Sequence, residues 1–154
     1  MTHFDDLFDY NAWGNAQVLA VTDQMSEEQL EREMPELGGS ALGLLDHMAQ
    51  VEAAVLAVMS GRERAARTTR PYAAVRTALE ANAEGYRAAM PGFLERLDER
   101  FELTWFGRSF TIEQGLLQVA THSVQHRAGI CAGMALAGKE APLLDYIAWC
   151  AQFR

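Results

Sequence analysis

The chain has 154 residues, a length that predicts one domain, residues 1–154, able to bury its own hydrophobic core. Hydrophobic residues make up 49% of the chain and charged residues 22%, which is typical of a globular protein. The formal net charge is -8, and the sequence contains no dense basic stripe. This charge balance argues against nucleic acid as the main partner.

The cysteine count and the N-terminus bear on the cellular compartment. Cys131 and Cys150 are too few for a disulfide framework, so both are predicted to be small buried hydrophobic residues in a reducing compartment. Met1–Asp6 is acidic and lacks the apolar core of a signal peptide. The longest apolar run, Ala53–Met59, is too short to span a bilayer. We therefore expect a cytoplasmic protein that does not bind membranes.

Four stretches carry apolar residues at the spacing of an amphipathic helix. They predict helices over residues 4–22, 41–60, 71–97 and 111–137. Ser40 is a predicted N-cap, and Ser26 and Thr111 begin capping-box patterns, the first of which predicts an additional helical turn. Pro91–Gly92 is expected to kink or split the third helix. No stretch shows the alternation of a strand, so the sequence predicts an all-α four-helix bundle with short extra helical segments.

The segments between these helices are predicted to be irregular. Residues 61–71 contain four arginines, Arg62, Arg64, Arg67 and Arg70. We interpret this segment as a solvated linker, and the alternative is a rim that steers anions near a pocket. Residues 98–110 are expected to form a second connection, and residues 143–154 a short fifth helix over one end of the bundle.

Two histidines on the last long helix are the strongest chemical signal. His122 and His126 are four residues apart, so their side chains share one helix face and can bind one metal ion. A third, His47, borders the apolar stripe of the second helix. Three neutral imidazoles favour Zn or Ni, with Fe, Cu and Mn as alternatives, and leave a coordination position open, as in catalytic sites. The other interpretation is that these histidines are polar residues at the edge of a core. No role is predicted for His3.

The residues around the histidines do not identify a catalytic group. Ser123 stands where a His-Glu-x-x-His metalloprotease has its general base, so a peptidase is a poor interpretation. Asp46 is predicted to lie on a solvated helix face, and Glu52 either there or against a ligand histidine. Asn11 and Asn15 are expected at the solvated edge of the first helix, with a role as donors in a pocket as the alternative.

Short pieces of the sequence, in chain order, resemble the DinB superfamily of small metal-binding helical bundles. The pieces are Tyr10–Asn15, Leu44–Met48 with Glu52, Phe110–Thr111 and Thr121–Arg127. The resemblance implies a four-helix bundle, often dimeric, that holds a divalent metal through three histidines, here His47, His122 and His126. The sequence departs from the common pattern at Gln125, where many members have His, and in having Arg127-Ala128-Gly129 where Arg-Gly-Gln is common.

The relatives implied by this resemblance include bacillithiol S-transferases, mycothiol-dependent isomerases and proteins linked to stress or DNA damage. We therefore expect a metal-dependent thiol S-transferase or hydrolase that acts on a small electrophilic molecule. The alternative is a non-catalytic metal-binding stress-response bundle. The open three-histidine site favours the enzyme, whereas the lack of an evident general base or nucleophile does not.

The missing base favours a thiol as the nucleophile. An unperturbed thiol has a pKa near 8.5, so it needs less help to ionise than water, at about 15.7. Cys131 is predicted to face away from His126, and Cys150 lies in the tail. The thiol would then come from a low-molecular-weight cofactor.

A homodimer is expected from the tryptophans and from the resemblance. Trp13, Trp105 and Trp149 are more large aromatic residues than a bundle of this size must bury. Trp13 in particular lies to one side of the first helix's apolar stripe, where it would line a pocket or a partner surface.

Overall fold

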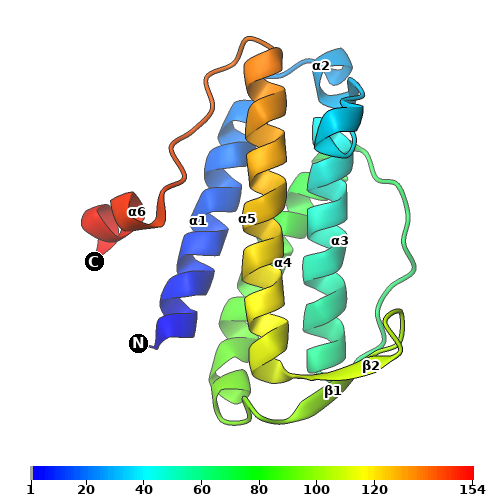
Figure 1. Ribbon diagram of the computed structural model, residues 1–154, viewed down its shortest axis with the longest axis vertical. Coiled ribbons are helices and arrows are strands. Elements are labelled where there is room, and N and C mark those ends of the chain that lie inside the picture. The colour runs from blue at the N-terminus through cyan, green and yellow to red at the C-terminus, as the bar shows by residue number, and fades with distance from the viewer. Residues whose placement is uncertain (1) are drawn as a thin grey trace.

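The computed structural model describes residues 2–154, in which four long helices form a bundle (Figure 1). These helices are α1 (His3–Thr22), α3 (Ala41–Met59), α4 (Tyr72–Leu94) and α5 (Ile112–Leu136). Each of α1 and α3 packs against both α4 and α5. α1 and α5 run in one direction and α3 and α4 in the other, so the segment between α3 and α4 runs back along α3, from the level of Ala57 to that of Asp46 (Figure 1). The predicted helical bundle is confirmed, with one small hairpin as an addition.

Short elements close the two ends of the bundle. α2 (Glu27–Glu31) and the 3-10 helix η1 (Pro35–Leu37) lie beside the beginning of α3 (Figure 1). At the opposite end, β1 (Arg100–Leu103) pairs with β2 (Arg108–Thr111) in an antiparallel hairpin. This hairpin leads directly into α5 and covers the end of α3.

The predicted helix starts are confirmed by their capping hydrogen bonds. The Ser40 side chain accepts from the backbone N–H of Gly43, which fixes the start of α3. Ser26 and Thr111 each form both hydrogen bonds of a capping box, at α2 and α5. These bonds satisfy N–H groups that have no partner inside the helix.

The bundle core is divided into two apolar clusters. One is centred on Leu45 and Met48 near the α2 end, and the other on Tyr86 and Phe93 near the hairpin. Between them, at one level of the bundle, the buried faces of all four long helices carry polar side chains. These are Asn11, Asn15, Glu52, Asn82, Ser123 and Arg127. We refer to these six residues as the polar layer.

One prediction about the second half of the chain is wrong, and for another the structure excludes one of two alternatives. Residues 98–110 contain strands, because Phe101 and Leu103 alternate with exposed residues and Phe101 packs onto the glycine face of α5 at Gly115. Of the kink or split expected at Pro91–Gly92, the split is excluded, because α4 continues past Pro91 to Leu94. Only the last helical turn follows Pro91, and Pro91 is exposed, so the carbonyl that loses its hydrogen bond can be solvated.

The C-terminal helix, α6 (Tyr146–Phe153), is present but lies beside α1 rather than over an end of the bundle (Figure 1). Trp149 is 3% exposed and packs edge-on against Tyr10, whose hydroxyl donates to the carbonyl of Leu144. Arg154 forms ion pairs with Asp6 and Asp9 of α1, both at 2.8 Å. These contacts place α6 along the first turns of α1.

One stretch of residues 2–154, Pro35–Met59, is long and apolar enough by composition to cross a membrane. An 18-residue window within it has a mean hydropathy of 1.4. Half of that window is buried inside the bundle. The stretch also contains Asp46, His47 and Glu52. This is the pattern of a core helix, since charged residues are costly inside a bilayer.

Candidate metal centre

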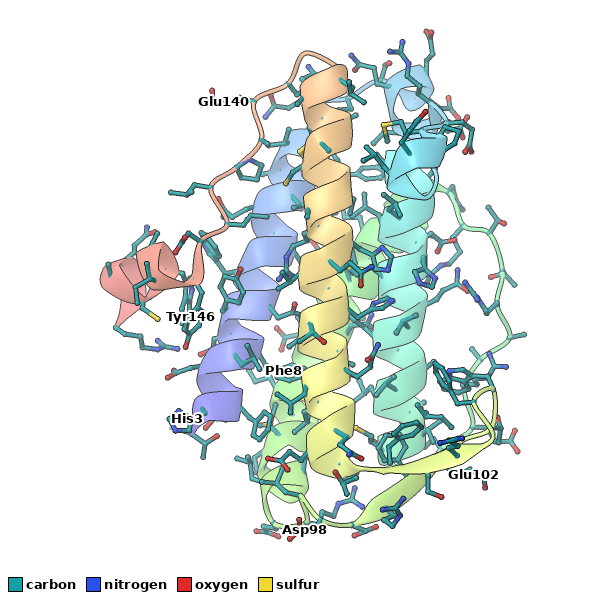
Figure 2. The ribbon with its side chains drawn as sticks, in the orientation of Figure 1. His3, Phe8, Asp98, Glu102, Glu140 and Tyr146 are labelled. Carbon is teal, nitrogen blue, oxygen red and sulfur yellow. The ribbon has the colours of Figure 1, made fainter. Side chains whose placement is uncertain are left out.

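The packing of α3 against α5 brings the three predicted ligands together. His47 belongs to α3, and His122 and His126 belong to adjacent turns of α5. The ring nitrogens that could bind a metal all lie within 4.8 Å of one another. His3 is exposed at the beginning of α1, away from this cluster (Figure 2).

The two shortest contacts within the cluster fit one metal ion. Nε2 of His122 lies 3.1 Å from Nε2 of His47 and 3.0 Å from Nε2 of His126. Nitrogens bound to one ion at about 2.1 Å are about 3.0 Å apart at a right angle and about 3.4 Å apart at a tetrahedral angle. A neutral imidazole has either one N–H or one lone pair at Nε2, so Nε2 of His122 cannot donate to one of its two neighbours and accept from the other. One cation can accept all three lone pairs.

The donor set indicates the class of metal. Within residues 2–154, no cysteine or carboxylate joins the three histidines in this cluster. Imidazole suits Zn, Ni, Fe and Cu, whereas Mg and Ca prefer oxygen ligands. All three side chains are half-buried, so the cluster is accessible from one side. Three protein ligands and access from solvent leave room for a further small ligand.

The cluster keeps its histidines neutral. Burial, together with repulsion from the adjacent His126 and His47, lowers the pKa of His122 to about 4, because three neighbouring cations would repel one another. Burial also lowers the pKa of His126 and of His47, with repulsion from Arg67 adding to the effect at His47. Neutral imidazole is the form that binds metals, so the site is ready for a cation at neutral pH.

We predict that the metal-free protein loses stability on acidification. An unfolded histidine has a pKa of 6.5, while that of His122 in the folded chain is about 4. Between these values the unfolded chain binds more protons, so a falling pH favours unfolding until the folded pKa is passed. The thermal midpoint of the metal-free wild type should fall between pH 6.5 and pH 4, and fall less in His122→Ala. Equal decreases in the two proteins would contradict this prediction.

Arg67 acts on the cluster from the connection between α3 and α4. Its guanidinium donates to Nδ1 of His47 at 3.0 Å. A guanidinium cannot accept, so Nδ1 of His47 must be the acceptor and the proton of a neutral His47 is on Nε2. Metal binding through Nε2 needs the opposite tautomer, with the proton on Nδ1. Nδ1 of His122, in contrast, is buried and has no hydrogen-bond partner among residues 2–154, so no hydrogen bond there fixes the tautomer of His122.

We expect Arg67→Met to raise the affinity for Zn. The substitution removes a donor that opposes the required tautomer and a positive charge beside the cation. The side chain is exposed, so the gain should be about 1 kcal/mol, or about fivefold. Competition with a chromophoric chelator measures it, with Arg64→Met as a matched change in the same segment. A lower affinity in Arg67→Met would show that Arg67 supports the site.

The polar layer lies next to the histidines and connects α5 to the other helices. Glu52 is 2% exposed, and its carboxylate accepts hydrogen bonds from Asn11, Asn15, Asn82 and Ser123. Arg127 is 1% exposed and donates to the side-chain oxygens of Asn11 and Asn15, each at 2.7 Å. The two asparagines therefore link a buried carboxylate to a buried guanidinium. Ser123 and Arg127 directly follow His122 and His126, so the layer fixes the helix that carries both ligands.

This layer corrects the predictions for Asn11, Asn15 and Glu52. The two asparagines are 5% and 4% exposed and are not at a solvated edge. Glu52 is neither solvated nor bonded to a ligand histidine, because asparagine and serine donors occupy its oxygens. No role was predicted for Arg127 from the sequence. Its spacing of four residues from Ser123, on the face that also carries buried Val119, is the signal that could have placed it inside.

Asp46 is also buried, contrary to the prediction of a solvated face. It is 7% exposed and forms an ion pair with Arg70 at 2.7 Å. Its carboxylate also accepts from the backbone N–H of Arg70. Asp46 therefore anchors the connection between α3 and α4, one residue away from His47.

Comparisons with known proteins agree with this fold. A model of the DinB family matches residues 1–151. A DinB-like protein from Bacillus cereus ATCC 10987 has a similar solved structure, with a TM-score of 0.59 and 21% sequence identity over 91% of this chain and 94% of that one. No curated protein matches the sequence. At this level of identity, the structural similarity establishes the shared helical fold alone.

Proposed function

The chain belongs to the DinB family, and from this membership and its three-histidine cluster we propose that it is a metal-dependent enzyme acting on a small electrophilic molecule. The preferred reaction is transfer of a low-molecular-weight thiol, and hydrolysis is the second form of the same proposal. The observation that carries it is the mutual approach of His47, His122 and His126 at a half-buried position. A divalent Zn or Ni ion bound there would lower the pKa of a thiol or of water.

The chain's own residues favour a thiol over water as the nucleophile. A water nucleophile needs a group that takes its proton, and both carboxylates of α3, the helix that carries His47, are engaged elsewhere. Glu52 is held by the donors of the polar layer, and Asp46 by Arg70. A thiol has a lower pKa than water and needs no such base.

Neither cysteine of the chain is placed to be that thiol. Cys131 is half-buried against the apolar cluster near α2, and burial raises the pKa of its thiol. Cys150 is in α6, which packs on α1 rather than on α3 or α5. Both are half-buried rather than fully buried as predicted. The proposal therefore requires a thiol from outside the chain.

The test is transfer of glutathione, bacillithiol and mycothiol to monochlorobimane by the metal-loaded protein. We expect transfer with at least one thiol by the wild type and by His3→Ala, and none above background by His47→Ala. His3 is the matched control, since it is exposed and outside the cluster. If the wild type never exceeds His47→Ala, the non-catalytic metal-binding bundle is the better account.

We further propose a homodimer, as expected for this family. Of the three tryptophans behind that expectation, Trp149 is covered by α1 within the chain, and Trp13 contacts Phe153. Trp105 is 40% exposed and would be the aromatic residue available to a partner. Light scattering that gives the mass of one chain at micromolar concentration would refute the dimer.

A further inference from the structure

The arginine-rich connection, residues 61–71, covers a pocket along α3. The pocket has a volume of about 760 Å³, within the usual range for small-molecule sites. Its floor is apolar and includes Val51, Val55 and Leu56 of α3. Trp105 and Phe106 of the hairpin turn form one wall. The connection has no helix or strand, as predicted, and all four of its arginines line this pocket, which favours the alternative of an anion-steering rim.

The connection is fixed to α3 at several points, so the pocket is built before any ligand arrives. The Gln50 side chain donates to the carbonyl of Thr68 at 2.9 Å and accepts from its N–H at 3.3 Å. Arg70 is held by Asp46, and the backbone N–H of Arg62 donates to the carbonyl of Ala57 at 2.8 Å. A preformed site loses little conformational entropy on binding.

The charges at this pocket are unusual for so acidic a chain. The net charge of the protein is -8, yet Glu63 is the one acidic residue among those that line the pocket. Within residues 2–154, Arg62, Arg64 and Arg67 form no ion pair with a carboxylate. The guanidinium of Arg64 lies 4.9 Å from the centre of the Trp105 ring. Stacking there leaves its N–H groups free to bind an anion.

A second pocket, between α1 and α4, shows the contrast. It has a volume of about 550 Å³ and is lined by both arginines and carboxylates. Arg76 pairs with Asp23 at 3.2 Å, and Arg87 pairs with Glu84 at 2.6 Å. Its positive charges are already neutralised, so of these two pockets the one beneath residues 61–71 is the one with guanidinium groups that lack a carboxylate partner.

We propose that the pocket beneath residues 61–71 binds a small molecule that carries an apolar group and a carboxylate or phosphate. The apolar group would lie on α3 between Val51 and Val55, against Trp105. The anion would be bound by Arg62 and Arg64, whose planar guanidinium groups match carboxylate and phosphate oxygens.

Arg67 connects this pocket to the metal centre, because it lines the pocket and donates to Nδ1 of His47. An oxygen anion beside Arg67 accepts from its guanidinium and, when His47 carries its proton on Nδ1, from His47 as well. This connection to the metal centre rests on the proposed function, and it names the substrate class of that function as a small anion with an apolar group. Anion binding by the arginines themselves requires no metal.

The experiment is calorimetric titration of the metal-free protein with three probes of similar shape: 1-naphthoate, 1-naphthyl phosphate and the neutral 1-naphthamide. We expect at least one anion to bind about tenfold more tightly than the amide. The variant Arg62→Gln/Arg64→Gln should lose this preference. The control Arg32→Gln/Lys139→Gln removes the same two charges outside the pocket and should keep it. The two anionic probes distinguish a carboxylate site from a phosphate site.

Three results would overturn the inference. These are equal binding of the amide and both anions, an equal loss of preference in the control variant, and no binding of any probe at millimolar concentration. The titration tests the pocket independently of the proposed metal function. Anion binding by a protein that fails to bind metal leaves the pocket standing, and metal binding without anion binding leaves the metal function standing.

Discussion

Purified protein is expected to hold about one divalent transition metal ion per chain, and His122→Ala almost none. Nε2 of His122 lies within 3.1 Å of both other Nε2 atoms, so it is the central member of the cluster. Without it, two imidazoles remain on different helices, and a two-ligand site is far weaker than one with three protein ligands. We expect the affinity for Zn to fall at least 100-fold, by analogy with the loss of a ligand-orienting group, which costs about 10- to 100-fold.

The measurement is elemental analysis after dialysis against a weak chelator, with Zn and Ni offered in separate samples. His3→Ala is the control, since it removes an exposed imidazole at the start of α1 and leaves the cluster intact. Metal should also raise the thermal midpoint of the wild type and of His3→Ala, because a ligand that binds only the folded state stabilises it. Equal metal content in His122→Ala and wild type would refute the assignment of this centre.

The sequence predicted the helices and the histidine cluster because both are set by local periodicity. Residues four apart on a helix share a face whatever the rest of the fold does, so His122 and His126 had to point together. Capping residues act within one turn, which is why Ser40 and Thr111 placed two helix starts correctly. The position of His47 opposite that pair depends on how α3 packs on α5. It was predicted from the resemblance to the DinB superfamily and does not follow from periodicity.

The hairpin and the polar layer were missed for different physical reasons. Strands of four residues have too few alternating positions to stand out, and β1 and β2 are stabilised by each other and by contact with α3 and α5. In the polar layer, the asparagines were expected at a solvated edge, and Glu52 either there or against a ligand histidine, since polar residues are usually exposed. Glu52 and Arg127 are buried because each compensates the other through residues of α1, and one sequence does not reveal such a pairing.

The polar layer gives the second large expected effect, on the free energy of unfolding. Glu52→Ala removes the carboxylate that opposes Arg127 and leaves a buried guanidinium without a nearby negative charge. It also deprives Asn11 and Asn15 of an acceptor at 3.1 Å each. Leaving a buried charge uncompensated costs about 3–5 kcal/mol, which corresponds to a decrease of about 10 °C in the thermal midpoint for a domain of this size.

The control for this prediction is Glu84→Ala, which removes a glutamate that pairs with Arg87 on the surface of α4 at 2.6 Å. Its side chain is 75% exposed, so this pair should contribute about 0.5 kcal/mol or less. Thermal and urea unfolding of the metal-free proteins compare the two variants without a contribution from metal binding. Equal destabilisation by the two substitutions would show that Glu52 stabilises the fold no more than a surface glutamate does.

A double substitution tests whether the asparagines couple the two buried charges. Arg127→Met alone should also destabilise, because it leaves Glu52 buried without a compensating cation. In Glu52→Ala/Arg127→Met no buried charge remains uncompensated, so the loss should be smaller than the sum of the single losses by about 1–3 kcal/mol. Additive losses would mean that the carboxylate and the guanidinium stabilise the bundle independently. A shortfall from additivity would instead establish that α3 and α5 are held at the level of the histidines by one charge-compensated unit, with Asn11 and Asn15 of α1 as its link.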